Sequence, residues 1–452
     1  MKNDFSKGSV VQNILKMALP MTMAQLINIL YNVVDRIYIG KLPEDATLSL
    51  TGIGLALPII TLMSAFANLF GMGGAPLCAI ARGKGDNEEA EYIMGNSFFL
   101  LICSGVILTV IGLVFKKPML YLFGASKETF PYANTYITIY LMGCVFVMIG
   151  LGMNSFINTQ GFGKIGMLTI LLGAGVNIVL DPIFIFIFKM GVGGAAIATV
   201  ISQGISALWV LHFLTGEKVI FKLRVKCFKL KWERVKKIIG LGMAGFIMAI
   251  TNGSVQIVCN ATLKTYGGDL YVGVMTIINT IREVITMPVA GITNGAQPVI
   301  GYNYGAKAYD RVKKAIQFMT ISCMVYTLLS WWLIHQFPRF FVQLLNDEAP
   351  LIEATVPALK IYFFGFFMMA FQFAGQSTFV ALGKSKQAIF FSLLRKAIIV
   401  IPLTLWLPSI NHMGVEGVFL AEPLSNFIGG LACFITMWLT VSYELKYKDS
   451  YK

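Results

Sequence analysis

The sequence predicts an all-α membrane protein with twelve transmembrane helices in two six-helix lobes, and three observations predict it. First, 56% of the 452 residues are apolar and only 13% are charged, whereas a soluble domain has about 45–50% apolar and about 25% charged residues. Second, the chain contains a dozen apolar runs of the ~20 residues that a helix needs to cross a bilayer. Third, features of the first half recur in the second. This composition excludes a secreted, cytosolic or nucleic-acid-binding protein.

The apolar runs are continuous and rich in Leu, Ile, Phe, Met and Gly. A membrane β-barrel would instead show strands of ~10 residues with alternating polar and apolar positions, so helices are expected. The expected spans are 13–39, 51–80, 92–115, 131–158, 165–188, 192–213, 238–264, 270–300, 312–337, 352–380, 387–408 and 413–440.

Basic residues predict the orientation of these spans. If the N-terminus is cytoplasmic, the inner segments carry 24 Lys and Arg, the outer loops 7 and the spans 5, where four lysines near the end of a span (Lys16, Lys264, Lys313 and Lys314) are counted with the adjoining loop. Cytoplasmic loops retain such an excess, so both termini are expected in the cytoplasm of a multi-pass protein of the cell (inner or plasma) membrane. The richest stretch, residues 216–237, is named here the basic segment; it is expected to link the lobes and can also attract anionic lipid. The expected domains are an N-lobe (1–215), the basic segment, and a C-lobe with a short cytoplasmic tail (238–452).

Two sequence matches relate the lobes to each other. The run GMGGAPLCAIARGKGD (71–86) aligns with GITNGAQPVIGYNYGA (291–306), and MGVGGAAIA (190–198) aligns with MGVEGVFLA (413–421), at offsets of 220 and 223 residues. Six spans separate each pair, so both copies enter the membrane from the same side and pseudo-twofold symmetry about the membrane normal is expected. Parallel repeats of this kind are typical of secondary transporters, whose substrate lies between the halves.

The sequence offers little for catalysis or for a cofactor. Seven cysteines are dispersed without a CxxC pair, and the three histidines lie far apart near the ends of apolar runs. This pattern predicts neither a disulfide framework nor a zinc site, and the glycine-rich turns lack the spacing of a phosphate loop. We therefore expect no enzyme activity and no cofactor.

Apart from Glu353 and Glu416, which lie within three residues of the start of an expected span, four acidic residues lie within the expected spans: Asp35, Asp181, Glu283 and Glu422. A charged carboxylate at mid-membrane costs about 2.5–3.5 kcal/mol on insertion scales, so each needs a partner or a function. Tyr31 lies one helical turn before Asp35, and an asparagine lies one turn before Asp181; each pair therefore shares a helix face.

Position along the spans predicts that some of these groups meet. Asp35 and Asp181 fall in the outer half of spans one and five, as Thr199 does in span six, all within roughly 12 Å of the outer surface at 1.5 Å per residue. Pro182 cannot donate a backbone hydrogen bond, which exposes a carbonyl beside Asp181 and favours a kink.

Several of these residues carry a resemblance to a known family. The runs NVVDRIYIG (32–40), NIVLDPIFIF (177–186) and QPVIGYNYGA (297–306), with the two MGV-x-G repeats, resemble the multidrug and toxic compound extrusion (MATE) transporters, nearer the DinF-like branch. The resemblance covers essentially the whole chain. It implies alternating access between two six-helix lobes, with export of drugs coupled to inward flow of H⁺ or Na⁺.

The resemblance also implies a coupling site in the N-lobe. In the family this site draws on an Asp and a Tyr of the first span, an Asn and Asp four apart in the fifth, and a Thr in the sixth. The matching residues here, with Asn154 of the fourth span as a further member, are Asp35, Tyr31, Asn177, Asp181, Thr199 and Asn154.

Burial and the second carboxylate favour a protonated site, whereas a bound cation favours an ionised one. Na⁺ is accordingly a candidate ligand of Asp35, Asn177, Asp181 and Thr199.

The C-lobe is less clearly marked. The family's other main branch uses acids in the seventh and tenth spans, where this chain has Gln256 and no acid. Arg282 and Glu283 of the eighth span are candidates for lining the lobe or contacting substrate. Glu422 is as consistent with helix packing.

Three function classes remain open on the sequence alone. The first is an exporter of small cationic or amphipathic molecules, expected to be a monomer surrounded by lipid. The second is a lipid or oligosaccharide flippase, which we expect to line its cavity with several basic residues. The third is a channel or receptor, for which no ring of repeated polar residues is visible. The natural substrate and the choice between H⁺ and Na⁺ stay open.

Overall fold

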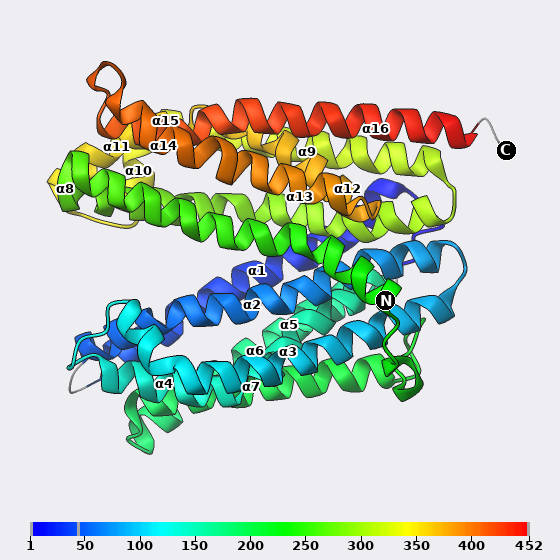
Figure 1. Cartoon of the computed structure of the whole chain (residues 1–452), viewed down its shortest axis with the longest axis horizontal. Helices are drawn as coiled ribbons and strands as arrows, with labels where there is room; N and C mark the ends of the chain where they lie inside the picture. The colour runs from blue at the N-terminus through cyan, green and yellow to red at the C-terminus, as the bar shows by residue number, and fades with distance from the viewer. Residues whose placement is uncertain (1–2, 43–45, 450–452) are drawn as a thin grey trace. The chain divides into compact units, whose positions relative to one another are not determined.

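The computed structural model describes residues 3–42 and 46–449, and this part of the chain is helical almost throughout, without strands (Figure 1). In chain order, the helices are α1 (Val10–Gly40), α2 (Ala46–Gly83), α3 (Asn87–Leu122), α4 (Phe130–Met142), α5 (Cys144–Thr159), α6 (Gly163–Pro182), η1 (Ile183–Ile187), α7 (Gly191–Thr215), η2 (Val225–Phe228), α8 (Trp232–Gly305), α9 (Tyr309–Gln336), α10 (Pro338–Gln343), α11 (Ala349–Phe363), η3 (Phe366–Met368), α12 (Met369–Ala381), α13 (Ser385–Leu393), η4 (Leu394–Val400), α14 (Ile401–Trp406), η5 (Leu407–His412), α15 (Val415–Ser425), η6 (Asn426–Gly430) and α16 (Leu431–Asp449).

The helices of the described chain account for twelve membrane crossings. Nine are long and apolar enough to cross singly, and two bent pairs, α4 with α5 (58°) and α11 with α12 (41°), bring the total to eleven. The 74 residues of α8 are two helices that meet at Gly268, whose φ of 71° is left-handed. A straight helix of that length would span about 110 Å, over three times the ~30 Å hydrocarbon core, so α8 crosses twice. The expected all-helical fold is confirmed.

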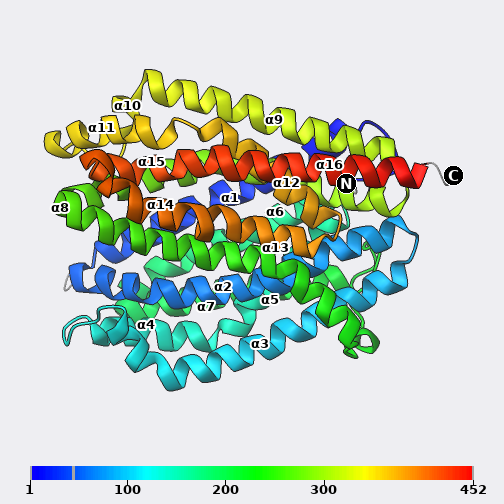
Figure 2. The same ribbon diagram turned by 45° about the horizontal axis from the view of Figure 1, so that its top comes forward.

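The crossings divide into two compact units of six. The first unit contains Leu19–Gly242, and the second contains Phe5–Ala18 and the chain from Met243 onward. The start of α1 therefore belongs to the second unit and the rest of α1 to the first. The basic segment lies inside the first unit. Figures 1 and 2 show the helices of each unit side by side from two directions.

Within the first unit, glycines allow α2 to approach two neighbours closely. A methyl group added at Gly71 would lie 2.5 Å from the carbonyl oxygen of Gly152 in α5, and one added at Gly73 would lie 2.2 Å from that of Ile238 in α8. Two residues apart on a helix means opposite faces, so α2 packs between α5 and the start of α8. Small residues at such contacts let helix backbones pack tightly where hydrophobic association is weak.

The basic segment is held by polar side chains of α3. The Asn96 amide donates to the carbonyls of Cys227 and Lys229, both at 3.0 Å, and Glu91 accepts a hydrogen bond from the Lys222 amide at 2.9 Å. These bonds satisfy backbone groups that would otherwise need water. The segment is therefore an ordered part of the first unit.

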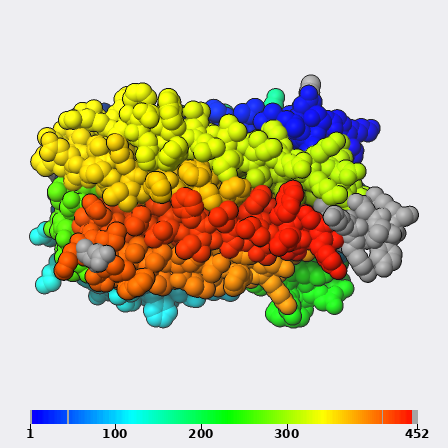
Figure 3. Space-filling view, turned by 90° about the horizontal axis from the view of Figure 1, so that it is seen from above, coloured from blue at the N-terminus to red at the C-terminus, as the bar shows by residue number. Residues whose placement is uncertain are grey.

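Helices of the second unit expose large apolar side chains. Figure 3 shows the surfaces of α9 to α16, coloured yellow to red, as neighbouring bands on the face in view. On α9 and α16, the side chains of Ile321, Val325, Trp438 and Leu439 are about half exposed or more. An exposed apolar face of this extent needs a lipid environment, as the composition predicts.

The close approach of α8 to α2 makes one glycine far less replaceable than its neighbour. A methyl group added at Gly242 would lie 1.8 Å from the carbonyl oxygen of Leu69, whereas one added at Gly245 meets nothing within 4 Å. Gly242→Ala should therefore lower the thermal unfolding midpoint of the purified protein. Gly245→Ala should leave it unchanged or raise it, because alanine favours a helix over glycine by about 1 kcal/mol. Equal midpoints for the two variants would contradict the packing described here.

Candidate functional site

Polar residues of three helices in the first unit converge on one point. Asn177 and Asp181 lie one turn apart on α6, and the Asn177 amide donates to the Asp181 carboxylate at 3.2 Å. The same amide lies 3.4 Å from the Thr199 hydroxyl of α7. All three side chains are almost completely buried. The spacing expected from the sequence therefore brings α6 and α7 together at these residues.

The first helix adds a second carboxyl group. The Asp35 carboxyl of α1 lies within hydrogen-bonding reach of that of Asp181, and the Tyr31 ring adjoins both acids. Neither acid is paired with a basic residue in any ion pair of the described chain. Two carboxyl groups this close need a proton or a cation between them, because like charges in a low-dielectric interior repel strongly.

Several oxygen atoms at this point lack a donor. Oδ1 of Asp35, Oδ2 of Asp181 and Oδ1 of Asn177 are buried and have no hydrogen-bond partner in the described chain. Buried polar atoms are almost always paired in proteins. All three orphan atoms are acceptors, so the group that completes the site is a proton, a water or a cation.

A small cavity adjoins these residues. It has a volume of about 60 Å³ and is lined by Tyr31, Asn177 and Thr199 together with further polar side chains of α1, α6 and α7. A drug-sized ligand needs a pocket of roughly 300–1,000 Å³, whereas a water needs only about 10–15 Å³. This cavity therefore admits ions and a few waters but not a drug.

The backbone beside Asp181 departs from a regular α-helix, as Pro182 predicts. Helix α6 ends at Pro182 and continues as a π-helical turn, η1. Proline cannot donate to the carbonyl four residues earlier, and π turns are frequent at functional sites. The acidic site therefore lies where the helix changes from α-helical to π-helical geometry.

Asn154 is not brought to this group. Its amide donates to the carbonyl of Gly166 at 3.2 Å, and eleven residues of α6, about 16 Å of helix, separate Gly166 from Asn177. Asn154 does not line the cavity either. In the structure it joins α5 to α6 near the turn between them.

Other polar residues, not expected from the sequence, do join the group. The Tyr136 hydroxyl of α4 lies within hydrogen-bonding reach of Thr199, and Asn28, Ser202 and Ser206 line the cavity. The signal that finds them is helical spacing. Asn28, Tyr31 and Asp35 are separated by three and four residues, and Thr199, Ser202 and Ser206 likewise, so each series is a polar stripe on one helix face.

The second unit contains a different cluster. Glu422 of α15 accepts hydrogen bonds from Lys396 (2.8 and 3.0 Å) and Arg395 (3.0 Å), both in the π-helical turn η4, and lies 3.9 Å from the Arg282 guanidinium of α8. Arg282 and Gln256 line a common cavity with Lys396 and Glu422. Glu283 is exposed and does not line it. The sequence pattern did not predict that Arg395, Lys396 and Glu422 meet.

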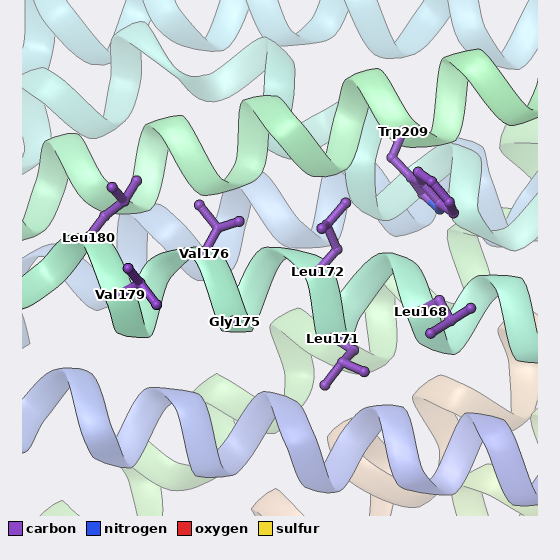
Figure 4. Close-up of a pocket in the computed structure, with 8 residues that line it drawn as sticks. All are labelled: Leu168, Leu171, Leu172, Gly175, Val176, Val179, Leu180 and Trp209. Carbon is purple, nitrogen blue, oxygen red and sulfur yellow. The ribbon is translucent and has the colours of Figure 1, made fainter.

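A wide apolar groove runs along α6 and α7. Its volume is about 550 Å³, and Figure 4 shows Trp209 projecting from α7 toward α6, whose Leu172 projects back. Eight residues line the groove: Leu168, Leu171, Leu172, Gly175, Val176, Val179, Leu180 and Trp209. Because these side chains are nearly all hydrocarbon and several are exposed, the groove has no group that could hold a coupling ion.

Comparison with known proteins agrees with this architecture. The MatE family model matches residues 20–183 and again residues 245–406, one copy in each unit. The multidrug export protein MepA of Staphylococcus haemolyticus is 27% identical over 437 residues, covering 95% of this chain and 94% of MepA.

Two similar solved structures are a MATE transporter in the bent conformation (TM-score 0.92, 23% identity, 98% of each chain) and the outward-facing conformation of a multidrug resistance MATE family transporter (TM-score 0.91, 22% identity, 99% of each chain). Both share the fold over the full length. Because the family model matches most of the sequence in two repeats, the chain belongs to the MatE family of multidrug and toxic compound extrusion transporters.

Proposed function

We propose that this transporter exports organic cations or amphipathic drugs in exchange for H⁺ or Na⁺, with the Asp35 and Asp181 pair as the coupling site. The observation that carries the proposal is the approach of two carboxyl groups, that of Asp181 fully buried and that of Asp35 partly buried, neither of which forms an ion pair with a basic residue in the described chain. A proton or a cation neutralises this pair, so ion occupancy changes the charge buried in the first unit. The multidrug export activity named for the staphylococcal relative supports the substrate class.

The ligand atoms of the pair suit a hard monovalent cation. Carboxylate, amide and hydroxyl oxygens converge from Asp35, Asp181, Asn177 and Thr199. The first three each contribute a buried oxygen without a donor, and the Thr199 hydroxyl lies 3.4 Å from the Asn177 amide. Oxygen ligands are those that hard cations prefer. When Na⁺ binds, it would supply positive charge to the ionised pair; when a proton binds, one carboxyl can donate to the other.

Coupling requires that ion binding at the Asp35 and Asp181 pair favours one conformation of the transporter over the other. An ion shifts a two-state equilibrium only by its difference in affinity between the states. Asp35 lies on α1, whose Pro20 interrupts the hydrogen-bond pattern. We propose that neutralising the pair lets α1 bend at Pro20 or between Asn28 and Asn32, which closes the cavity of the first unit and opens the path outward. This is alternating access.

The chain is proposed to act as a monomer in the plasma membrane. Both termini are proposed to lie in the cytoplasm, because 24 of the 36 basic residues then face inward. A flippase for lipid or oligosaccharide is a weaker candidate. Its head group would have to reach the basic residues of the second unit, where the cavity measures only about 20 Å³.

Removing either carboxylate should abolish coupling. In everted vesicles loaded under separate pH and sodium gradients, Asp35→Asn and Asp181→Asn should each reduce gradient-driven transport of a fluorescent cation by about tenfold or more, the range of a coupling energy of 1–3 kcal/mol. The amide keeps the shape of the side chain but cannot exchange a proton.

The matched control is Glu353→Gln, which neutralises an exposed acid of α11. It should transport like the wild type, and all variants should reach the membrane in equal amounts. Gradient-driven transport at the wild-type rate in Asp35→Asn would refute the proposal. The gradient that drives the wild type identifies the coupling ion.

The unpaired polar atoms of the same site should lower the stability of the folded protein. Asp181→Asn removes a buried carboxylate with an unpaired oxygen, so its thermal unfolding midpoint should equal or exceed that of the wild type even though coupling is lost. Asn154→Ala should instead lower the midpoint, because it deletes a buried hydrogen bond between α5 and α6 worth about 1 kcal/mol. A midpoint for Asp181→Asn well below that of Asn154→Ala would contradict the functional assignment and indicate a structural role.

A further inference from the structure

The charged cluster of the second unit has no role in the coupling proposed above. Four helical elements supply it: Arg282 from α8, Arg395 and Lys396 from η4, and Glu422 from α15, with Tyr362 of α11 beside them. The side chains of Lys396, Glu422 and Arg395 are 2%, 6% and 8% exposed, and that of Arg282 is 29% exposed. Distant parts of the chain therefore build a site that is buried except at Arg282.

The cluster has more positive than negative charge. Three basic side chains face the single carboxylate of Glu422. Arg395 also donates a hydrogen bond of 2.8 Å to the side-chain oxygen of Asn426, and this amide side chain is neutral. A second acid that acts electrostatically on Arg282, Glu283, follows it in the helix, points about 100° away from it and is exposed. Counted at their formal charges, the buried side chains of the cluster and Arg282 therefore carry two more positive than negative charges.

An uncompensated excess of this kind is expensive inside a membrane protein. Basic side chains within spans are almost always paired, because an unpaired charge there is strongly unfavourable. An anion bound in the cluster would offset the repulsion between the basic side chains.

Space for such an anion is present. A cavity of about 20 Å³ touches Arg282, Lys396 and Glu422, and its wall also contains the amide side chains of Asn252 and Gln256. One water-sized species needs about 10–15 Å³, so a single small ion fits. The amides and the guanidinium provide N–H donors to it.

We propose that this cavity is an anion site that binds one small monovalent anionic group against Arg282 and Lys396. The group is either a free halide or a carboxylate carried by the transported molecule, because both present a single negative charge to N–H donors. The site lies in the opposite unit from Asp35 and Asp181 and does not depend on which ion drives transport.

The test uses the full-length protein in nanodiscs and measures its thermal unfolding midpoint at constant sodium concentration, ionic strength and pH. Sodium gluconate, whose anion is too large for the cavity, is replaced stepwise by sodium chloride or sodium formate. Saturating anion should raise the wild-type midpoint by about 2 °C or more, since a ligand stabilises the folded state it binds. A response to formate alone identifies a carboxylate site, and a response to chloride identifies a free halide site.

Two variants locate the site. Arg282→Gln leaves the pairs of Glu422 with Lys396 and Arg395 in place, so it should fold and raise the anion concentration for half-maximal stabilisation by about tenfold or more. Glu422→Gln should lower that concentration, because it removes the competing negative charge. Lys360→Gln, which neutralises an exposed lysine of α11, should match the wild type.

The absence of a saturable response in the wild type would overturn the proposal. So would an equal response in wild type and Arg282→Gln. Because the measurement is of binding, it stands apart from any failure of the coupling proposal.

Discussion

The approach of the Asp35 and Asp181 carboxyl groups is the interaction on which the organisation of the first unit depends. It brings α1 to α6, and the Asn177 amide continues the contact to Thr199 of α7. In a bundle that is otherwise apolar, the two acids have no basic partner, and repulsion at low dielectric is strong. In the function proposed here, a mobile ion supplies and withdraws the missing positive charge, which a permanent salt bridge at this position would prevent.

The two units share a backbone feature but differ in the charged residues around it. In each, a buried acid precedes a proline, and a π-helical turn follows: Asp181 and Pro182 before η1, and Glu422 and Pro423 before η6. The first unit leaves its acids without a basic partner, whereas the second surrounds its acid with three basic side chains. The two turns are not counterparts in the repeat, because the offset of 223 residues aligns Glu422 with Thr199 of the sixth crossing, whereas Asp181 lies in the fifth.

The sequence is sufficient for the architecture because composition, run length and charge bias are properties of whole segments. It is also sufficient for much of the acidic cluster, since Asn177 and Asp181 share a face by spacing and Thr199 lies at matching depth. It is less informative about Asn154. In a hairpin centred near residue 161, Asn154 faces the early turns of α6, where Gly166 lies, whereas Asn177 faces residues near 145.

The charged cluster of the second unit could not be predicted in this way, because no local sequence pattern indicates which faces of η4 and α15 point toward each other. The one available signal was that Arg395 and Lys396 lie eight and nine residues after the start of their expected span (387–408), about 12–14 Å along the helix, too deep for solvated charges. The bends between α4 and α5 and between α11 and α12 were likewise not visible in continuous apolar runs.

The order of the basic segment has a consequence for how the protein can be dissected. A stretch with nine lysines and arginines is the natural place to cut a two-lobe chain or to insert a fluorescent domain. Here its backbone amides and carbonyls are partners of Glu91 and Asn96, so an insertion there would strip α3 of its contacts. A protein split within this segment would therefore lose packing contacts in the first half, whether or not the two halves can function as separate chains.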